Sequence, residues 1–321
     1  MMRRAGPVLC AALFVTLAAC RGGGGDRGFM SFGTAPPGGA FFQVGGALVE
    51  VLNQAGADRG WKITAEATSG SQENIRRLVR GELDFALSNS AITYHAVRGS
   101  EGWDQQYPVR SVMTLAPNVA LFIAPRASGI TSIQDLRGKR VVIGPAGAGF
   151  EFFVKPLLAA HGLSYEDFTP LNATQAAAVD MLADGSAAAA FIGGAVPTAS
   201  ITQAAASQDI VFVPYEEAAM AKLVDEYPFF SRATIPANTY RGQTEDFHSL
   251  DTGSMHLITA ANADEQLVYD ITRALYENRE RVVQAHPAGR SINPRNVVRN
   301  LGTEFHPGAI RYYRESGIWK D

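Results

Sequence analysis

The stretch 140–162, RVVIGPAGAGFEFFVKPLLAAHG, contains a short β-branched strand, a glycine-rich turn and an apolar helix in direct succession. A strand that leads through a tight turn into a helix is the repeating unit of α/β proteins, whose parallel strands are joined by helices. The stretch therefore predicts an α/β fold, provided that the rest of the chain repeats the same unit.

Units of the same kind precede and follow this stretch. A short strand that ends in a turn is predicted within residues 28–36, a helix within 38–56 with Gly56 as its stop, and a buried strand at 83–90. Residues 62–68 alternate Ile63, Ala65 and Ala67, as a half-buried strand does. Two such runs predict a two-lobed fold, in which each lobe is a mostly parallel sheet flanked by helices and the ligand cleft lies between the lobes.

Composition narrows the class of protein. The chain has 321 residues, 46% of them hydrophobic, which is enough for two lobes with their own cores. Its net charge is −3, and removing residues 1–19, with Arg3 and Arg4, leaves 26 − 31 = −5. An acidic body without a basic block argues against nucleic acid as a partner. Cysteine occurs only at Cys10 and Cys20, so neither a disulfide nor a cysteine metal site is expected in the body.

The first twenty residues, MMRRAGPVLCAALFVTLAAC, have the layout of a secretory signal peptide: two arginines, an apolar run and small residues. Residues 17–20, Leu-Ala-Ala-Cys, resemble the lipobox of bacterial lipoproteins, in which the cysteine is lipidated. This predicts a signal peptide at 1–19, lipidation at Cys20, a glycine-rich tether at 20–28 and an extracytoplasmic, membrane-anchored protein. The alternative is an ordinary secretory peptide with an incidental cysteine.

Two glycine and serine segments are candidate ligand contacts. In 144–149, GPAGAG, the spacing is neither the dinucleotide GxGxxG nor a P-loop, so the segment is either an anion contact through backbone N–H groups or a plain tight turn. In 68–74, TSGSQEN, Ser69 and Gln72 form a capping-box pattern, and a second serine, Ser71, exceeds what a cap needs. Asn89, Ser90 and Gly193 end predicted strands, where α/β sheets place ligands.

Catalysis has little support in the sequence. The six histidines show no metal-ligand spacing, no GxSxG nucleophile elbow occurs, and the predicted mature body has no cysteine nucleophile. We therefore predict a protein that is not an enzyme and that carries neither a metal nor a cofactor.

Five blocks in order carry a resemblance to a known family: FGTAPPGGAFFQVGGALVEVLN (32–53), EATSGSQENIRRLVRGELDFALSNS (66–90), SIQDLRGKRVVIGPAGAGF (132–150), EYPFFSRATIPANTYRGQ (226–243) and HPGAIRYYRE (306–315). Over roughly 29–316 the chain resembles the TAXI family of TRAP-transporter solute-binding proteins. The resemblance implies a type II periplasmic binding protein, with lobe 1 at 29–118 plus 261–321 and lobe 2 at 119–260. It also implies capture of a small carboxylate or amino acid, similar to glutamate or 2-oxoglutarate, for an ion-coupled TRAP permease.

The same resemblance carries over a set of ligand contacts from both lobes. Those of the first lobe are Thr34, Phe41, Ser69, Ser71, Gln72, Asn89 and Ser90, and those of the second are Gly147, Ala148, Gly149 and Gly193. Phe41 stands where the family commonly has tyrosine, and Ala148 stands in a loop that commonly carries serine and threonine. These departures favour a less polar acid, because a buried ligand oxygen without its donor costs ~1–3 kcal/mol.

The sequence leaves three other functions open: a ligand-sensing lipoprotein of the same fold that signals to a membrane partner, a binding protein of an ABC-type transporter, and a secreted enzyme. The resemblance further places the hinge near 118–124 and 256–260, where the chain is expected to cross between the lobes.

Overall fold

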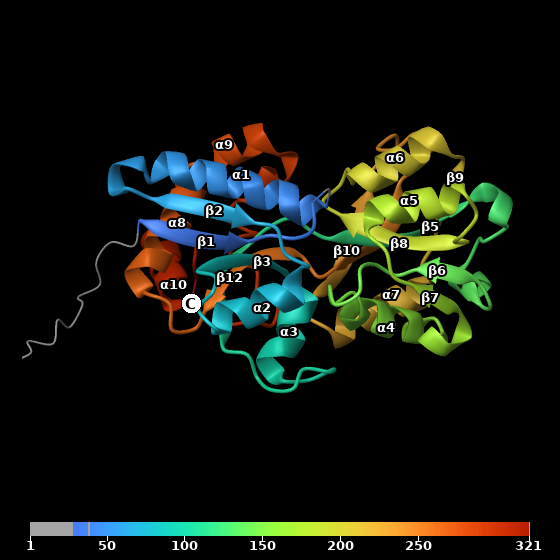
Figure 1. Ribbon diagram of the computed structural model, residues 1–321, viewed down its shortest axis with the longest axis horizontal. Coiled ribbons are helices and arrows are strands. Elements are labelled where there is room, and N and C mark those ends of the chain that lie inside the picture. Colours follow the sequence, from blue (N-terminus) through green and yellow to red (C-terminus); the bar gives the residue numbers. More distant parts are fainter. Residues whose placement is uncertain (1–27, 38, 321) are drawn as a thin grey trace, which may run out of the picture.

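The computed structural model describes residues 28–37 and 39–320. The predicted signal peptide, Cys20 and all of the predicted tether except Gly28 lie outside the described residues. Two lobes lie side by side along the long axis of the molecule, each built on a sheet that helices flank (Figure 1). In the part of the chain that is described, no helix combines the length and the apolar character that crossing a membrane requires.

The first lobe contains a mixed sheet. Its strand order is β2 (Lys62–Glu66), β1 (Phe29–Gly33), β3 (Phe85–Asn89), β12 (Met255–Ala260) and β4 (Val109–Thr114). β1 runs parallel to β2 and β3, whereas β12 is antiparallel to both β3 and β4. β2 is an edge strand, and of the alternating set predicted there only Ile63 is buried, while Ala65 and Ala67 are exposed.

Helices cover both faces of this sheet. Along β3, Phe85 and Leu87 join one apolar core while Ala86 joins the other, as the two-residue period of a strand requires. The first core receives α1 (Ala40–Ala55), α8 (Glu265–Glu277), α9 (Arg279–Ala285) and α10 (Pro307–Glu315). The second core receives α2 (Ser71–Val79) and α3 (Ser90–Arg98). α1 ends at Gly56, as predicted.

The second lobe holds a larger sheet. Its strand order is β10 (Phe230–Ile235), β11 (Phe247–Thr252), β5 (Val119–Pro125), β8 (Ala189–Gly194), β6 (Arg140–Val142) and β7 (Thr169–Leu171), and β9 (Ile210–Val213) also pairs with β5. The helices of this lobe are α4 (Glu151–Ala160), α5 (Gln175–Ala183), α6 (Ala199–Ser207) and α7 (Glu217–Glu226). Residues 140–162 form β6, the glycine-rich turn and α4, as predicted.

The second sheet is mixed, and its parallel and antiparallel parts have different causes. β6 pairs in parallel with β7 and β8, and α4 and α5 are the crossovers that connect these strands. β5 is antiparallel to β8, β9 and β11, and β10 is antiparallel to β11. Strand and helix alternation predicted a mostly parallel sheet, which holds only for β6, β7 and β8, because alternation carries no information on the direction of a strand that enters from the other lobe.

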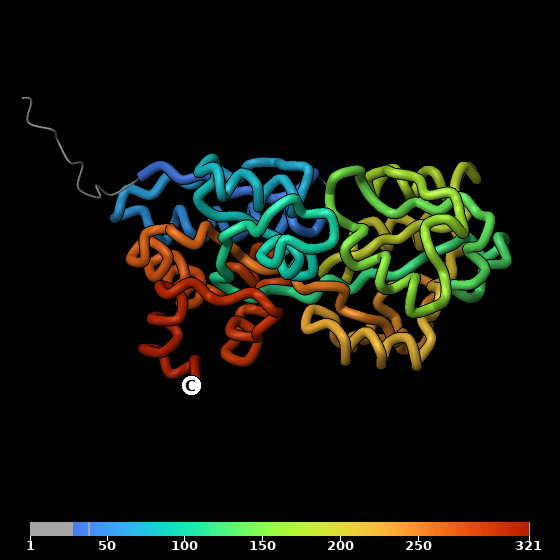
Figure 2. The backbone as a smooth tube through the Cα atoms, turned by 90° about the horizontal axis from the view of Figure 1, so that it is seen from below, coloured from blue at the N-terminus to red at the C-terminus, as the bar shows by residue number. Residues whose placement is uncertain are grey.

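The chain crosses between the lobes twice. It leaves the first sheet after β4 and enters the second at β5, and it returns between β11 and β12, at residues 253–254. The expected boundary at residue 260 is therefore wrong: β12 lies in the first sheet, paired with β3 and β4. The expected hinge at 118–124 and 256–260 is displaced for the same reason, because β5 and β12 are sheet strands and only Asn118 lies in a crossing. Figure 2 shows the C-terminal segment, from α8 onward, staying with the first lobe.

Candidate functional site

A cavity of about 100 Å³ lies between the two lobes. Its first wall comes from the loop after β1, the start of α2 and the end of β3, and its second wall comes from the glycine turn after β6, the start of α5 and the end of β8. These are strand ends at which α/β proteins place ligands. The predicted contacts that line the cavity are Thr34, Phe41, Ser69, Ser71, Asn89, Ala148 and Gly193.

Hydrogen bonds within the first lobe hold the polar part of the wall in place. The Ser71 hydroxyl oxygen accepts from the Asn89 N–H at 2.9 Å. The Asn89 side chain donates to the Gly253 carbonyl at 2.8 Å, and its oxygen accepts from the Ala91 N–H at 2.8 Å, which caps α3. The Thr34 hydroxyl donates to the backbone carbonyl of Glu66 at 2.7 Å. The hydrogen of the Ser71 hydroxyl is therefore the donor in this group that is left for a ligand.

Several helices begin at the cavity. α1 starts after Gly39 and α2 after Gly70, and neither start has a side-chain cap. α4 starts after Phe150, also without a side-chain cap, whereas Thr174 caps α5. Residues at all four of these starts line the cavity. Uncapped backbone N–H groups and the positive end of the helix dipole both favour a negatively charged group.

Apart from Asn118, Thr174 and Gln175, the remaining lining is mostly apolar. Phe41 and Ile92 come from the first lobe, and Phe150 and Phe153 come from the second, with the two phenylalanine rings 5.2 Å apart. Among the described residues that line the cavity, none is Asp, Glu, Lys, Arg or His. In the described part of the chain, His, Cys, Asp and Glu side chains also form no group of three or more that could hold a metal ion.

Four predicted contacts lie outside the lining. Gln72 donates to Glu151 Oε1 at 2.8 Å and thereby joins α2 to α4 across the lobes. Ser90 is fully buried at the start of α3. Gly147 is exposed on the glycine turn, with φ +72°. Gly149 has φ +93°, and a Cβ there would lie 2.7 Å from Cδ1 of Ile92, so this glycine permits close approach of the two lobes.

The predicted capping box at the start of α2 paired Ser69 with Gln72, and this pairing is wrong, because Ser69 pairs with Glu73. The N-cap residue is Gly70, whose φ of +122° turns the chain so that the first helical residue is Ser71. The backbone N–H of Ser69 donates to the Glu73 carboxylate at 2.8 Å, and the Ser69 hydroxyl donates to the same oxygen. These bonds lower the pKa of Glu73. Gln72, the predicted partner, is thus left to reach the other lobe.

Sequence reasoning missed part of the wall: Pro36, Ile92, Asn118, Phe150, Phe153, Thr174 and Gln175. Thr174 precedes an alanine-rich helix, so its capping role was a detectable signal. Gln175 donates to the Gly193 carbonyl at 2.8 Å, which ties the start of α5 to the end of β8. No local pattern marks Asn118, because its position depends on the first crossing.

The lobes touch each other beside the cavity through aromatic rings. His95 of α3 and the nearby Trp103 both stack on Phe152 of α4, with ring centroids 5.6 and 5.9 Å apart and interplanar angles of 28° and 27°. Trp103 is only 6% exposed. Burial lowers the pKa of His95. These contacts and the Gln72–Glu151 bond hold the two walls together, so the described arrangement is a closed one.

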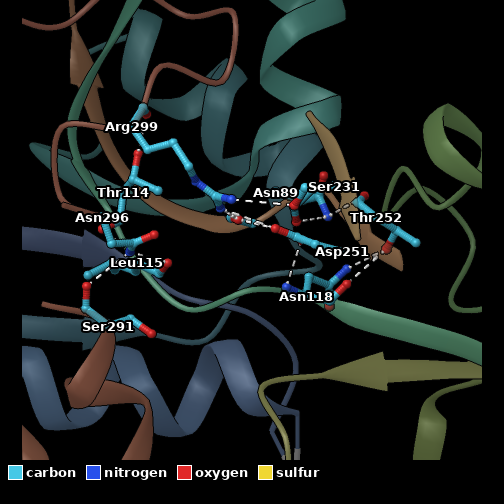
Figure 3. A network of polar contacts seen from close by, with 12 residues as sticks. Asn89, Thr114, Leu115, Asn118, Ser231, Asp251, Thr252, Ser291, Asn296 and Arg299 are labelled. Atoms are coloured by element: carbon cyan, nitrogen blue, oxygen red, sulfur yellow. Dashed lines mark hydrogen bonds and ion pairs between the residues drawn. The ribbon is translucent and has the colours of Figure 1, made fainter. Parts of the chain in front are cut away.

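A buried polar network braces the crossings (Figure 3). Asp251 accepts from the Asn118 N–H at 3.0 Å and pairs with Arg299 at 3.2 Å, and the Ser254 hydroxyl also donates to it. Asn296 donates to the Leu115 carbonyl at 2.9 Å. Burial raises the pKa of Asp251, while the bond from Ser254 and the charge of Arg299 act in the opposite direction. The C-terminal segment thus fastens both crossings beside the cavity.

The two lobes, the two crossings that connect them and the cavity between them define the fold of periplasmic binding proteins. The chain belongs to the NMT1-like family, whose model matches residues 32–317.

Solved structures of low sequence identity share this fold. PhnD1 from Prochlorococcus marinus, in complex with methylphosphonate, is 7% identical and has a TM-score of 0.59, with 91% of this chain and 99% of that chain covered. The alkanesulfonate-binding protein SsuA from Xanthomonas axonopodis pv. citri, bound to MOPS, is 17% identical, with a TM-score of 0.50 and coverage of 90% and 91%. An ancestral arginine-binding protein bound to arginine is 16% identical, with a TM-score of 0.50 and coverage of 85% and 99%.

Proposed function

We propose that this protein is an extracytoplasmic solute-binding protein that captures a small organic acid between its lobes and delivers it to an ion-coupled TRAP-type permease. The observation that carries the proposal is the cavity between the lobes, at which three helices begin without side-chain caps. Such starts favour an anion. The three related structures described above contain small bound molecules, among them methylphosphonate.

Closure is the proposed mechanism. A ligand that touches both walls favours the closed arrangement by its difference in affinity for the closed and open forms. The two crossings are the segments at which the lobes would rotate, and the Gln72–Glu151 bond and the stacking on Phe152 would form as the lobes meet. A permease would then distinguish the closed form from the open form. The five TAXI-like blocks support a TRAP-type permease as the partner.

Membrane anchoring through Cys20 is part of the same proposal. A lipid on Cys20 would keep the protein near its permease and raise its effective concentration there. Replacing Cys20 with serine should abolish labelling by a fatty-acid probe in a bacterial host. Continued labelling of the C20S variant would refute the anchor while leaving the solute-binding proposal intact.

A thermal-shift screen of the purified protein against keto acids, dicarboxylates, amino acids and simple carboxylates tests the binding function. A ligand at 100 times its Kd should stabilise the folded state by ~2.7 kcal/mol. The solute-binding proposal fails if no compound shifts the unfolding midpoint and denaturing the purified protein releases no small molecule.

A pair of variants on one loop tests whether this cavity is the site. Ala148 lines the cavity and is buried, whereas Ala146 is exposed two residues earlier and does not line it. Ala148→Leu should fill part of the cavity and weaken binding of any ligand found by the screen, while Ala146→Leu should bind normally. Equal affinities of the two variants would place the site elsewhere.

A further inference from the structure

The composition of the cavity wall restricts which acids fit the proposed function. None of the described residues that line the cavity is ionisable. The arginines of α2 are engaged elsewhere: Arg77 pairs with Glu66 at 2.6 Å, and Arg76 lies over the Trp103 ring at 4.7 Å and donates to Gln72. Ionisable side chains gather instead in a separate hollow, whose lining includes Glu101, Glu151 and Lys155.

A wall without charges discriminates between classes of small acid. A dicarboxylate would bury a second anion that needs a cationic partner, and an amino acid would bury an ammonium that needs an anionic one. The wall supplies neither partner. One anionic group can still be held, because α1 and α2 begin at the cavity without side-chain caps in the first lobe, and α4 does so in the second.

The hydroxyl group of Ser71, the first residue of α2, adds a side-chain donor to the backbone groups of the helix starts. Its side chain lines the cavity although the residue is only 6% exposed. Its oxygen accepts from the Asn89 N–H with one of its two lone pairs, and its O–H is left as a donor for a ligand. A donor at the start of α2 suits a ligand oxygen of an anion.

The apolar side chains of the cavity wall favour an apolar group in the rest of the ligand. Phe41, Ile92, Phe150 and Phe153 contribute apolar surface from both lobes to a cavity of about 100 Å³. Burial of an aliphatic or aromatic group against such a surface is favourable, whereas burial of further polar groups is not. The ligand should therefore have a small apolar body.

We infer that the solute is a small monoanion, with one carboxylate or sulfonate group on an apolar body, and that the site rejects amino acids and dicarboxylates. This inference rests on the proposed function and makes its ligand class more specific. The anionic group lies at the helix starts with the Ser71 hydroxyl, and the apolar body lies among the phenylalanine rings and Ile92.

Isothermal titration calorimetry of the full-length purified protein with matched probes tests the inference. The probes are 4-methylpentanoate, leucine, which adds an ammonium, glutarate, which replaces the branched end by a second carboxylate, and butanesulfonate, which changes the anionic group. We expect at least one monoanion to bind, and leucine and glutarate to bind about 100-fold more weakly or not at all. The affinities for 4-methylpentanoate and butanesulfonate show whether the site prefers a carboxylate or a sulfonate group.

The possible failures are distinguishable. If glutarate or leucine binds as tightly as the monoanions, the inference is overturned while the solute-binding function stands. If no probe binds, mass spectrometry of molecules released on denaturation decides: a monoanion with an apolar body supports the inference, and a dicarboxylate or amino acid overturns it. If nothing is released either, both the inference and the proposed function fail.

A serine pair tests the assigned position of the anionic group. Ser71→Ala should weaken monoanion binding about 10-fold, because it removes one donor to a charged group. Ser111, a buried serine of β4 that does not line the cavity, provides the matched control, and Ser111→Ala should keep the affinity. An unchanged affinity in Ser71→Ala would overturn this position for the anion.

Discussion

Replacing His256 with glutamine should remove part of the protein's loss of stability in acid. His256 lies on β12 and is fully buried. Its Nε2 lies 2.8 Å from the Thr93 hydroxyl, and its Nδ1 is buried without a hydrogen-bond partner among the described residues. Burial lowers the pKa of His256 from 6.5 to about 3. The folded protein therefore holds a neutral imidazole over a range in which the unfolded chain binds a proton.

The sign and size of the effect follow from this difference. Because the folded pKa of His256 is the lower one, its contribution is fully present above pH 6.5 and is lost as pH falls from 6.5 towards 3. The free energy of unfolding should fall by ~1.4 kcal/mol per pH unit from this residue alone, hence by ~2 kcal/mol between pH 6.5 and 5. Glutamine cannot titrate, so the variant should lack this part of the slope.

Urea unfolding followed by circular dichroism, at several pH values from 7.5 to 5, measures the effect. The unfolding free energy of wild type minus that of His256→Gln is compared between pH values. Titrations common to both proteins subtract out of this difference, and the packing loss of the variant adds only a constant that does not change with pH. That difference should change by ~2 kcal/mol over the range, in favour of the variant as pH falls. His248, which is exposed, is the control position for the same substitution. Parallel pH profiles of wild type and His256→Gln would refute the reasoning.

Two further substitutions test the crossings and the closed arrangement. Arg299→Ala leaves the buried carboxylate of Asp251 without its cation and should lower the free energy of unfolding by ~3 kcal/mol; an unchanged thermal midpoint would contradict this. Gln72→Ala removes the bond to Glu151 across the lobes and should weaken ligand binding about 5-fold, or ~1 kcal/mol, measured by calorimetry. Gln54→Ala is the control, because the Gln54 side chain donates to a glutamate within the same helix, α1. Equal ligand affinities of the two variants would show that the bond between the lobes does not contribute to closure.

Local patterns in the sequence were sufficient for many individual elements. The strand, glycine turn and helix at 140–162, the helix that ends at Gly56 and the buried strand ending at Asn89 all lie where periodicity and turn residues predicted them. The polar residues at strand ends and at the start of α2 were predicted too, and Thr34, Ser71 and Asn89 line one cavity. Such signals depend on neighbours within a few residues, so they can be read from the chain alone.

Only the tertiary structure decided how these elements combine. The partner of Gln72 is Glu151, far along the chain, and Asn118 reaches the cavity wall because the first crossing places it there. β12 belongs to the first sheet because it pairs with β3 and β4. The absence of ionisable side chains from the described cavity wall likewise emerges only when both lobes contribute to it. Contacts between distant segments depend on strand direction and crossing geometry, which a local pattern does not encode. The sequence by itself therefore determined the α/β units and the polar strand ends, and the packing of the two lobes decided which side chains form the site.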